Sequence, residues 1–466
     1  MKNTYMILSV SLCLWAGAAM GQFKVLLNLN GTNGMEPVYS TPYLSNGVLY
    51  CPATYGGAID SGTIFSIDTN GTNYNDLHDF TGKTGKFPVG SFIGIGHTLY
   101  GTCGLGGKYD SGCIFSIHSD GSAYKDIYDF AGPLGYEPIA PMTLVGGKLY
   151  GTAVYGGALN KGSIFSVDTD GTNFSDLHDF LGINGTFPLS TLVLEGNTLY
   201  GVDVQGGKND SGCIFSIQTN GALYKDIFDF AGPNGKEPVG GLCVSGGTLY
   251  GVTFSGGAFE GGCIFSLDTT GANYTDLHDF TKNTGIGCYG PMTLKNDVLF
   301  GTCVGGGAND SGCIFSIKTD GGSYRDIYDM NHLGYTCEVN GLVISGETMY
   351  GLTSVGGTNK DGVLFSFTNP LLGVSSIKAI TGSIGVYPNP SNGMFTIVEN
   401  GKLKMENEQN SVEVYNVLGE KVYSQFSTLN SPLSINLSDQ PNGVYLYKVL
   451  SENGDLLGQG KLVIQK

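Results

Sequence analysis

Apolar and polar positions along residues 22–368 form short runs that recur every fifty residues. In the third copy the runs are Ile139–Leu144, Lys148–Val154, Ser163–Asp168 and Asn173–Phe180. Between the runs lie glycine, asparagine and aspartate, as expected for strands joined by turns. No run has a helical period long enough to compete with a strand. The pattern therefore predicts four antiparallel strands in every copy.

The first and second runs of each copy are separated by a two-residue hairpin. It reads Asn46-Gly47 in one copy and Gly146-Gly147 in another, and these residues adopt the positive φ angles that a type I′ turn requires. Glycine accounts for 76 of the 466 residues, but it has no three-residue period, which excludes a collagen-like chain. The glycines instead mark the chain reversals.

A fixed period of this size predicts a repeat architecture. The triplet Ile64-Phe65-Ser66 returns in each of seven copies and ends as Leu364-Phe365-Ser366. The first copy is preceded by a segment that matches the fourth run of the others, whereas the last copy stops after its third run. A ring in which Val25–Leu29 completes the last sheet uses this spare strand and leaves no exposed sheet edge. We predict an all-β, seven-bladed β-propeller over residues 22–368, with an open solenoid as the alternative.

The N-terminal segment 1–21 has one early lysine, an apolar run, and small residues before Gln22. This order is typical of a secretory signal peptide, with cleavage between Gly21 and Gln22. The apolar run is too short to be a permanent membrane anchor. We expect an exported chain, without a transmembrane segment.

Beyond residue 368 the repeat pattern ends. Residues 369–384 predict a linker, and residues 385–466 predict a small Ig-like β-sandwich. The expected strands of this second domain are Met394–Val398, Val412–Val417, Lys421–Phe426, Leu433–Leu437, Val444–Val449 and Lys461–Gln465.

Four motifs of this segment occur in a fixed order: Val386–Gly393, Val414–Gly419, Gly443–Val449 and Lys461–Lys466. They resemble the type A C-terminal sorting domain of the type IX secretion system. The resemblance implies a member of the Bacteroidota, passage through the periplasm, handling by the type IX machinery, and release or surface attachment. The sorting-motif residues that it assigns are Pro388, Asn389, Pro390, Gly393, Gly443, Tyr445, Lys461, Val463 and Lys466.

The repeats carry a Leu-Tyr-Gly-Thr start, a glycine pair and a Phe-Ser strand, as at 149–152, 156–157 and 165–166. They resemble the GloVer tandem-repeat family over about residues 22–368. The resemblance implies a secreted protein and assigns no particular activity.

The formal charge of −17, with Arg325 as the single arginine, excludes a nucleic-acid partner, which needs a basic footprint. The acidity favours solubility and attracts cations, so calcium is kept as a candidate ion, and no other cofactor is expected.

Two pairs of cysteines flank the same loop in different copies. An oxidising route permits Cys103–Cys113 and Cys303–Cys313 disulfides there. No cysteine spacing predicts a zinc site. His78, His178 and His278 occupy one repeat position, and we interpret them as packing residues.

The loops between the second and third strands emerge on the same side of a propeller as the segments that join successive blades. Carboxylates and tyrosines in these loops could bind a cation or stack on a sugar, although ordinary solvated turn residues also fit this composition. The candidate ligand-binding residues are Tyr55, Asp60, Tyr109, Asp110, Tyr155, Asp210, Asp310, Glu137 and Glu237.

No Gly-x-Ser-x-Gly elbow, phosphate loop or His-Glu-x-x-His motif is present, so no catalytic residue is assigned. We expect a non-enzymatic binding or adhesion module, secreted or on the outer-membrane surface, that binds a glycan, a surface protein or a cation. The alternative is a polysaccharide lyase or hydrolase on a propeller scaffold.

Overall fold

The computed structural model describes residues 22–330, 339–369, 383–400, 410–416, 421–427, 433–450 and 456–466. The predicted signal peptide, with Gly21, lies outside the described residues, as do residues 370–382 of the predicted linker and Cys337. The chain divides into two compact units, Met1–Gly373 and Val374–Lys466. Neither unit contains a helix in its described part, so the prediction of an all-β protein is confirmed. Accordingly, the described residues include no helix long and apolar enough to cross a membrane.

The described strands of the first unit form seven antiparallel sheets. The first three sheets hold β2 (Tyr43–Ser45), β3 (Val48–Ala53), β4 (Thr63–Asp68) and β5 (Asn75–Asp79); β6 (Lys86–Ile95), β7 (Thr98–Leu105), β8 (Cys113–His118) and β9 (Lys125–Asp129); and β10 (Thr143–Val145), β11 (Lys148–Ala153), β12 (Ser163–Asp168) and β13 (Ser175–Asp179).

The next three sheets hold β14 (Val193–Glu195), β15 (Thr198–Asp203), β16 (Cys213–Gln218) and β17 (Lys225–Asp229); β18 (Leu242–Ser245), β19 (Thr248–Val252), β20 (Cys263–Asp268) and β21 (Thr275–Asp279); and β22 (Ile286–Cys288), β23 (Thr293–Lys295), β24 (Val298–Gly305), β25 (Cys313–Lys318) and β26 (Arg325–Asp329). The last sheet holds β27 (Val339–Ser345), β28 (Thr348–Thr353), β29 (Val363–Thr368) and β1 (Gln22–Asn28).

The third repeat shows how its sequence makes these strands. Gly146 and Gly147 have φ angles of 57° and 82°, as the predicted two-residue hairpin requires, and they join β10 to β11. The first strand is shorter than predicted and begins at Thr143. Pro138 and Pro141 precede it, and proline cannot donate a ladder hydrogen bond.

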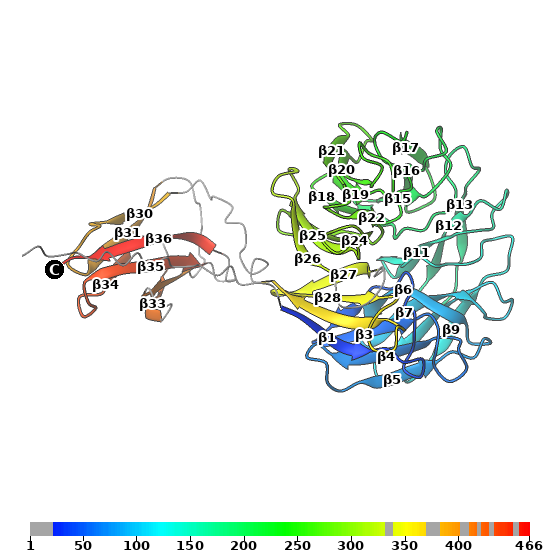
Figure 1. Cartoon of the computed structure of the whole chain (residues 1–466), viewed down its shortest axis with the longest axis horizontal. Coiled ribbons are helices and arrows are strands. Elements are labelled where there is room, and N and C mark those ends of the chain that lie inside the picture. The colour runs from blue at the N-terminus through cyan, green and yellow to red at the C-terminus, as the bar shows by residue number, and fades with distance from the viewer. Residues whose placement is uncertain are drawn as a thin grey trace, which may run out of the picture. The chain divides into compact units, whose positions relative to one another are not determined.

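Successive sheets pack face to face through apolar clusters, each shared by two neighbours. One cluster joins Ile114 and Phe130 of the second sheet to Leu149 and Phe165 of the third. Six further clusters continue this pattern, and the last joins Tyr350 and its neighbours to the first sheet. The packing therefore returns to its starting point, and Figure 1 shows the first unit's colours running around a centre until yellow β28 lies near blue β1.

Aromatic pairs bridge the outer parts of neighbouring sheets. His178 stacks on Tyr224 with ring centroids 3.6 Å apart, and Phe228 stacks on Tyr274 at 4.7 Å. His78 and His278 stack on the equivalent tyrosines, so the expected packing role of the three histidines is confirmed. Burial lowers the pKa of all three imidazoles.

The prediction that the N-terminal strand completes the last sheet is confirmed. β1 pairs antiparallel with β29, and Leu29 donates its N–H to the Gly362 carbonyl at 3.0 Å. Phe23 of β1 stacks on Tyr328 at 4.7 Å, which continues the aromatic pairing of the other sheets. The chain start therefore takes the fourth-strand position that the seventh repeat lacks.

The second unit contains two antiparallel sheets around one core. The first holds β30 (Ser383–Tyr387), β31 (Met394–Asn400) and β34 (Leu433–Asn436), and the second holds β32 (Asn410–Tyr415), β33 (Lys421–Ser427), β35 (Gly443–Leu450) and β36 (Leu456–Ile464). Phe395 and Ile435 of the first sheet pack against Val412, Tyr447 and Leu462 of the second. The six expected strands are found, and β30 is an additional one.

Candidate functional site

The segments that join successive sheets are fixed from two sides. Glu137 donates its N–H to the Ser111 carbonyl of the preceding sheet's loop at 3.1 Å. Next to it, Tyr136 and Tyr155 exchange backbone hydrogen bonds at 3.0 and 3.3 Å, which ties the segment to the end of its own second strand. Phe87 and Phe187 make the equivalent bonds to Ser61 and Lys161. Side chains on these segments are thereby held at defined positions.

These segments have an unusual backbone. Tyr39, Phe87, Glu137 and Phe187 have φ angles of 55°, 57°, 56° and 58°. For bulky side chains this left-handed region is sparsely populated and costs on the order of 1–3 kcal/mol per residue. At the position equivalent to Phe87, Glu137 and Phe187, the sixth repeat has Gly287, with φ of 63° and without that cost. Glu237 of the fifth repeat shares the conformation, so positive φ at this position is a general feature of the repeat that glycine would accommodate more easily.

The four strained residues line one cavity of about 530 Å³. Its aromatic lining consists of Tyr39, Tyr55, Phe87, Tyr155 and Phe187. The remaining wall is mainly aliphatic and includes Val38, Ile139, Val154, Leu189 and Val204, with Glu137, Thr54 and Gln205 as polar members. A smaller cavity of about 40 Å³ shares Tyr39, Ile139 and Leu189 with it and extends to Thr41 and Pro291. The larger cavity has the volume of a typical small-ligand site.

Contacts between rings order the aromatic lining. Tyr55 packs on Phe87 with centroids 4.7 Å apart, and Tyr155 meets Phe187 edge to face at 5.4 Å. Tyr155 also stacks on Tyr136 at 5.1 Å, outside the lining. Such pairs favour fixed ring positions, because offset and edge-to-face arrangements are preferred.

Glu137 dominates the electrostatics of the cavity. Burial raises the pKa of its carboxyl. Burial, followed by the nearby negative charge of Glu137, raises the pKa of Tyr155, so this phenol is neutral at physiological pH. None of the described lining residues is a lysine, arginine or histidine.

The structure brings together three of the predicted ligand-binding residues, Tyr55, Glu137 and Tyr155, in this cavity. Asp60 and Asp210 do not line it; they accept hydrogen bonds from the N–H groups of Gly56 and Gly206 at 2.9 and 3.1 Å within their own loops.

The other predicted ligand-binding residues also lie outside the lining of this cavity. Asp110 pairs with Lys86 at 3.3 Å, and Asp310 pairs with Lys282 at 2.9 Å. Glu237 accepts a hydrogen bond from the Ser255 hydroxyl at 3.1 Å. The ring of Tyr109 lies 4.8 Å from the Lys108 ammonium and is largely exposed.

Sequence reasoning missed Tyr39, Phe87 and Phe187. The signal that could have found the two phenylalanines is a large residue directly before the repeated proline, at Pro88 and Pro188. Each proline packs its ring on a glycine of the preceding sheet, as Pro188 Cδ does on Gly162, where an added Cβ would lie only 2.6 Å away. The contact between proline and glycine fixes the position of the phenylalanine that directly precedes the proline.

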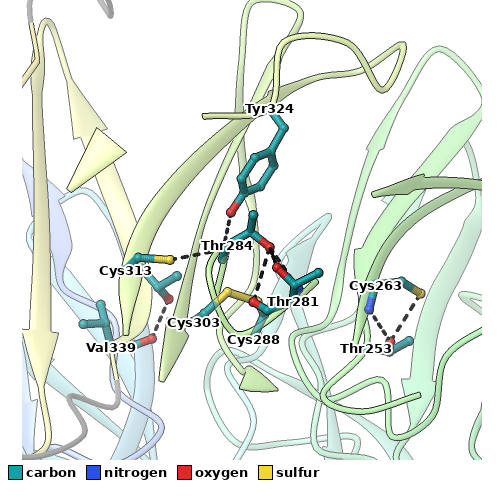
Figure 2. The surroundings of a disulfide bond; sticks show 10 residues. Thr253, Cys263, Thr281, Thr284, Cys288, Cys303, Cys313, Tyr324 and Val339 are labelled. Atoms are coloured by element: carbon teal, nitrogen blue, oxygen red, sulfur yellow. Dashed lines mark hydrogen bonds between the residues drawn. A yellow bond between two sulfur atoms is a disulfide. The ribbon is translucent and has the colours of Figure 1, made fainter. Parts of the chain in front are cut away.

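The predicted disulfides need correction. The structure links Cys303 to Cys288, not to Cys313, because β22 brings Cys288 opposite Cys303 on the other edge of β24 (Figure 2). Cys313 is a thiol that donates to the Thr284 carbonyl at 3.6 Å. In the second sheet Pro88 takes the position of Cys288, and Cys103 and Cys113 face each other as thiols on either side of the β7–β8 ladder. Neither predicted bridge is therefore present.

Five of the repeated aspartates of the fourth strands accept a backbone hydrogen bond from the loop beside them. Asp129 accepts the N–H of Lys108 at 2.6 Å, and Asp229 accepts that of Lys208 at 2.6 Å. Burial, and then the neighbouring Asp129, raises the pKa of Asp126 to about 6. Among the described residues no group of three or more histidine, cysteine or acidic side chains is placed to hold a metal ion.

The sorting-motif residues are in contact within the second unit. The Asn389 amide donates to the Lys461 carbonyl at 2.7 Å, and its oxygen accepts the Val463 N–H at 2.8 Å. The Lys466 ammonium donates to the Gln440 carbonyl at 2.8 Å, and the Tyr445 hydroxyl donates to that of Pro441 at 2.9 Å. Gly443 is the first residue of β35, and Pro388, Pro390 and Gly393 lie in the connection between β30 and β31.

Comparison with solved structures gives likenesses of fold alone. The chain is similar to the extracellular domains of a putative one-component and a putative hybrid two-component system, BT4673, from B. thetaiotaomicron. It is 12% and 11% identical to them, with TM-scores of 0.50 and 0.51, over 95% and 96% of this chain and 58% and 59% of theirs. It therefore spans about three fifths of their length. A further likeness, to the beta-propeller domain of the Trilobed protease from Pyrococcus furiosus, has 12% identity and a TM-score of 0.45, over 71% of this chain and 95% of that one.

No curated protein matches the chain. Two family models do. The model of the Gloeobacter/Verrucomicrobia repeat matches residues 16–215 and 204–404, and that of the secretion system C-terminal sorting domain matches residues 385–465. Both resemblances noted in the sequence are thereby confirmed. The chain belongs to the Gloeobacter/Verrucomicrobia repeat family and carries a type IX sorting domain, which directs it to the cell surface or to secretion.

Proposed function

We propose that this protein is an exported binding module that holds a small ligand, or a small group of a larger one, in the cavity lined by Tyr39, Tyr55, Phe87, Glu137, Tyr155 and Phe187. Residues 22–368 act as a seven-bladed β-propeller closed by β1, and residues 385–466 as an Ig-like sorting domain that follows a linker. Residues 1–21 act as a signal peptide.

A single observation carries this proposal: five aromatic side chains and one carboxylate line a single cavity of about 530 Å³. Tyr39, Phe87, Glu137 and Phe187 reach it from positions of positive φ. Glu237 has the same backbone conformation outside the cavity, so the strain belongs to the repeat, and the side chains gathered at this cavity are what supports binding.

The composition of the lining supports binding over the polysaccharide-cleaving alternative. Glycoside hydrolysis ordinarily uses two carboxyl groups about 5–10 Å apart. Of the described residues that line the cavity, Glu137 alone has a carboxylate. Its aromatic neighbours provide apolar contact area.

The test is a ligand screen on the exported full-length chain, with glycans, small metabolites and calcium, compared with the Phe87→Gly/Phe187→Gly variant. We expect ligands that the wild-type protein binds and the variant does not. Equal binding by both proteins would place the ligand elsewhere, and turnover of a bound polysaccharide would favour the enzyme.

A further inference from the structure

The cavity combines aromatic rings with a single acidic side chain. We propose that it selects organic cations: an ammonium group lies among the rings of Tyr39, Tyr55, Phe87, Tyr155 and Phe187, with the Glu137 carboxylate as its counter-charge. This inference names the ligand class of the proposed function and rests on it. The occupant is a low-molecular-weight alkylammonium compound.

The first argument is the charge of Glu137. Three of the acidic residues that lie outside the lining have local partners: Lys86 for Asp110, Lys282 for Asp310, and the Ser255 hydroxyl for Glu237. Glu137 lines the cavity and forms no ion pair with any described residue. A partly buried carboxylate without a cation favours a ligand that brings one.

The second argument is the aromatic lining. The faces of tyrosine and phenylalanine rings carry negative potential, which attracts an ammonium ion within about 6 Å of the centroid. Tyr55 with Phe87 and Tyr155 with Phe187 place two such pairs on one cavity. Alkylated ammonium groups suit it best, because their methyl groups fill apolar space and spread the charge.

The third argument is what the lining lacks. A neutral sugar would bring no charge to balance Glu137, and the Thr54 hydroxyl is already bonded to Val38 at 3.0 Å. An anion would meet the Glu137 charge, and no lysine, arginine or histidine among the described lining residues would balance it. The formal charge of −17 adds long-range attraction for cations.

The test uses the exported full-length chain and two probes of the same shape, choline and its uncharged carbon isostere 3,3-dimethylbutan-1-ol, measured by calorimetric titration. We expect choline to bind at least about ten-fold more tightly, the ratio that cation–π contact in a partly desolvated site supports. Glu137→Gln should weaken choline binding at least about five-fold and leave the affinity for the isostere unchanged. Glu237→Gln, which changes a carboxylate outside the cavity, should leave both affinities unchanged.

The outcomes separate this inference from the proposed function. Equal affinity for both probes, or an unchanged choline affinity in Glu137→Gln, overturns cation selectivity and leaves the cavity as a binding site for neutral ligands. Absence of choline binding at tens of millimolar also overturns the inference. The proposed function itself falls only if, in addition, no ligand of the wider screen distinguishes the wild-type protein from Phe87→Gly/Phe187→Gly.

Discussion

The backbone N–H of Thr358 donates to the side-chain oxygen of Asn28 at 2.9 Å, although the two residues are 330 positions apart. In five of the other sheets an aspartate accepts the same bond, as Asp329 does from Ala308 at 2.6 Å. Asn359 likewise donates to the Leu29 carbonyl, as Asn209 does to that of Phe230. The chain start therefore reproduces the contacts of a repeat's own fourth strand, and the ring closes with the chemistry that it uses elsewhere.

Substitutions at Asn28 test this closure. Asn28→Ala removes the acceptor and should lower the free energy of unfolding by about 1 kcal/mol, the usual net value of one such bond. Asn28→Asp restores the residue type of the other sheets and should stay within about 0.5 kcal/mol of wild type. Denaturant unfolding of the exported chain measures both. If the two variants unfold alike, the bond does not contribute to closure.

Replacing a strained residue of the cavity should weaken ligand binding and leave the stability of the protein nearly unchanged. Phe187→Gly should change the free energy of unfolding by less than about 1 kcal/mol, because relief of the positive φ offsets the loss of packing between this ring and Tyr155. Phe180→Ala, which truncates a fully buried ring, should cost about 3–5 kcal/mol. Ligand affinity, measured by titration, should fall at least about five-fold in Phe187→Gly, because the ring's packing on the ligand contributes roughly 1 kcal/mol. A large loss of stability in Phe187→Gly would show that the ring serves the fold.

The sequence predicted the repeat, the hairpins and the closing strand, because each depends on a local pattern such as Gly146-Gly147. It predicted only part of the cavity. Tyr55, Tyr155 and Glu137 carry polar groups that mark them as candidates, but Phe87 is apolar, and its place in the cavity follows from contacts with the neighbouring sheet. Cys288 was missed as a partner for a similar reason, since its pairing requires β22 to extend the sheet beside β24.

Asp203 predicts a dependence of stability on pH. Its side chain is fully buried, and burial raises the pKa of its carboxyl well above the ordinary value, with the Cys213 thiol as its neighbour at 3.7 Å. Above about pH 4 the unfolded chain releases this proton while the native chain retains it, so stability falls as pH rises through the native pKa. The equivalent pair of the next sheet is Thr253 and Cys263, in which the Thr253 hydroxyl accepts the Cys263 N–H at 3.0 Å.

Asp203→Thr copies that neighbouring pair. We expect it to raise the free energy of unfolding at pH 8 by about 1–3 kcal/mol, with a gain that shrinks toward pH 4, because it removes a buried, poorly satisfied carboxyl group. Unfolding curves between pH 4 and 8 measure the effect. Glu195→Thr removes an exposed charge from the same sheet and should show no such trend. A gain independent of pH would mean that packing, not titration, is responsible.

The disulfide of the sixth sheet predicts a pattern of thiol reactivity. Without reductant, alkylation of the unfolded chain should spare Cys288 and Cys303 and modify Cys313 (Figure 2). Cys288→Ser should lower the free energy of unfolding by about 2–3 kcal/mol, given the short loop that the bond closes. Peptide mass mapping identifies the modified residues. Protection of Cys313 together with modification of Cys288 would favour the Cys303–Cys313 bridge instead.

We expect export of the protein to depend on the contacts that Asn389 makes within the sorting domain. Its amide donates to the Lys461 carbonyl and accepts the Val463 N–H, so one side chain joins the motif near Pro388 to the final strand. Asn389→Asp keeps the acceptor and turns the donor into a negative oxygen facing a carbonyl, which should cost about 1–3 kcal/mol. We expect less of this variant at the cell surface or in the medium and more inside the cell, as measured by fractionation and immunoblotting. Asn392→Asp makes the same chemical change at an exposed position three residues away, so export that is equal for both variants would exclude the Asn389 contacts from any role in sorting.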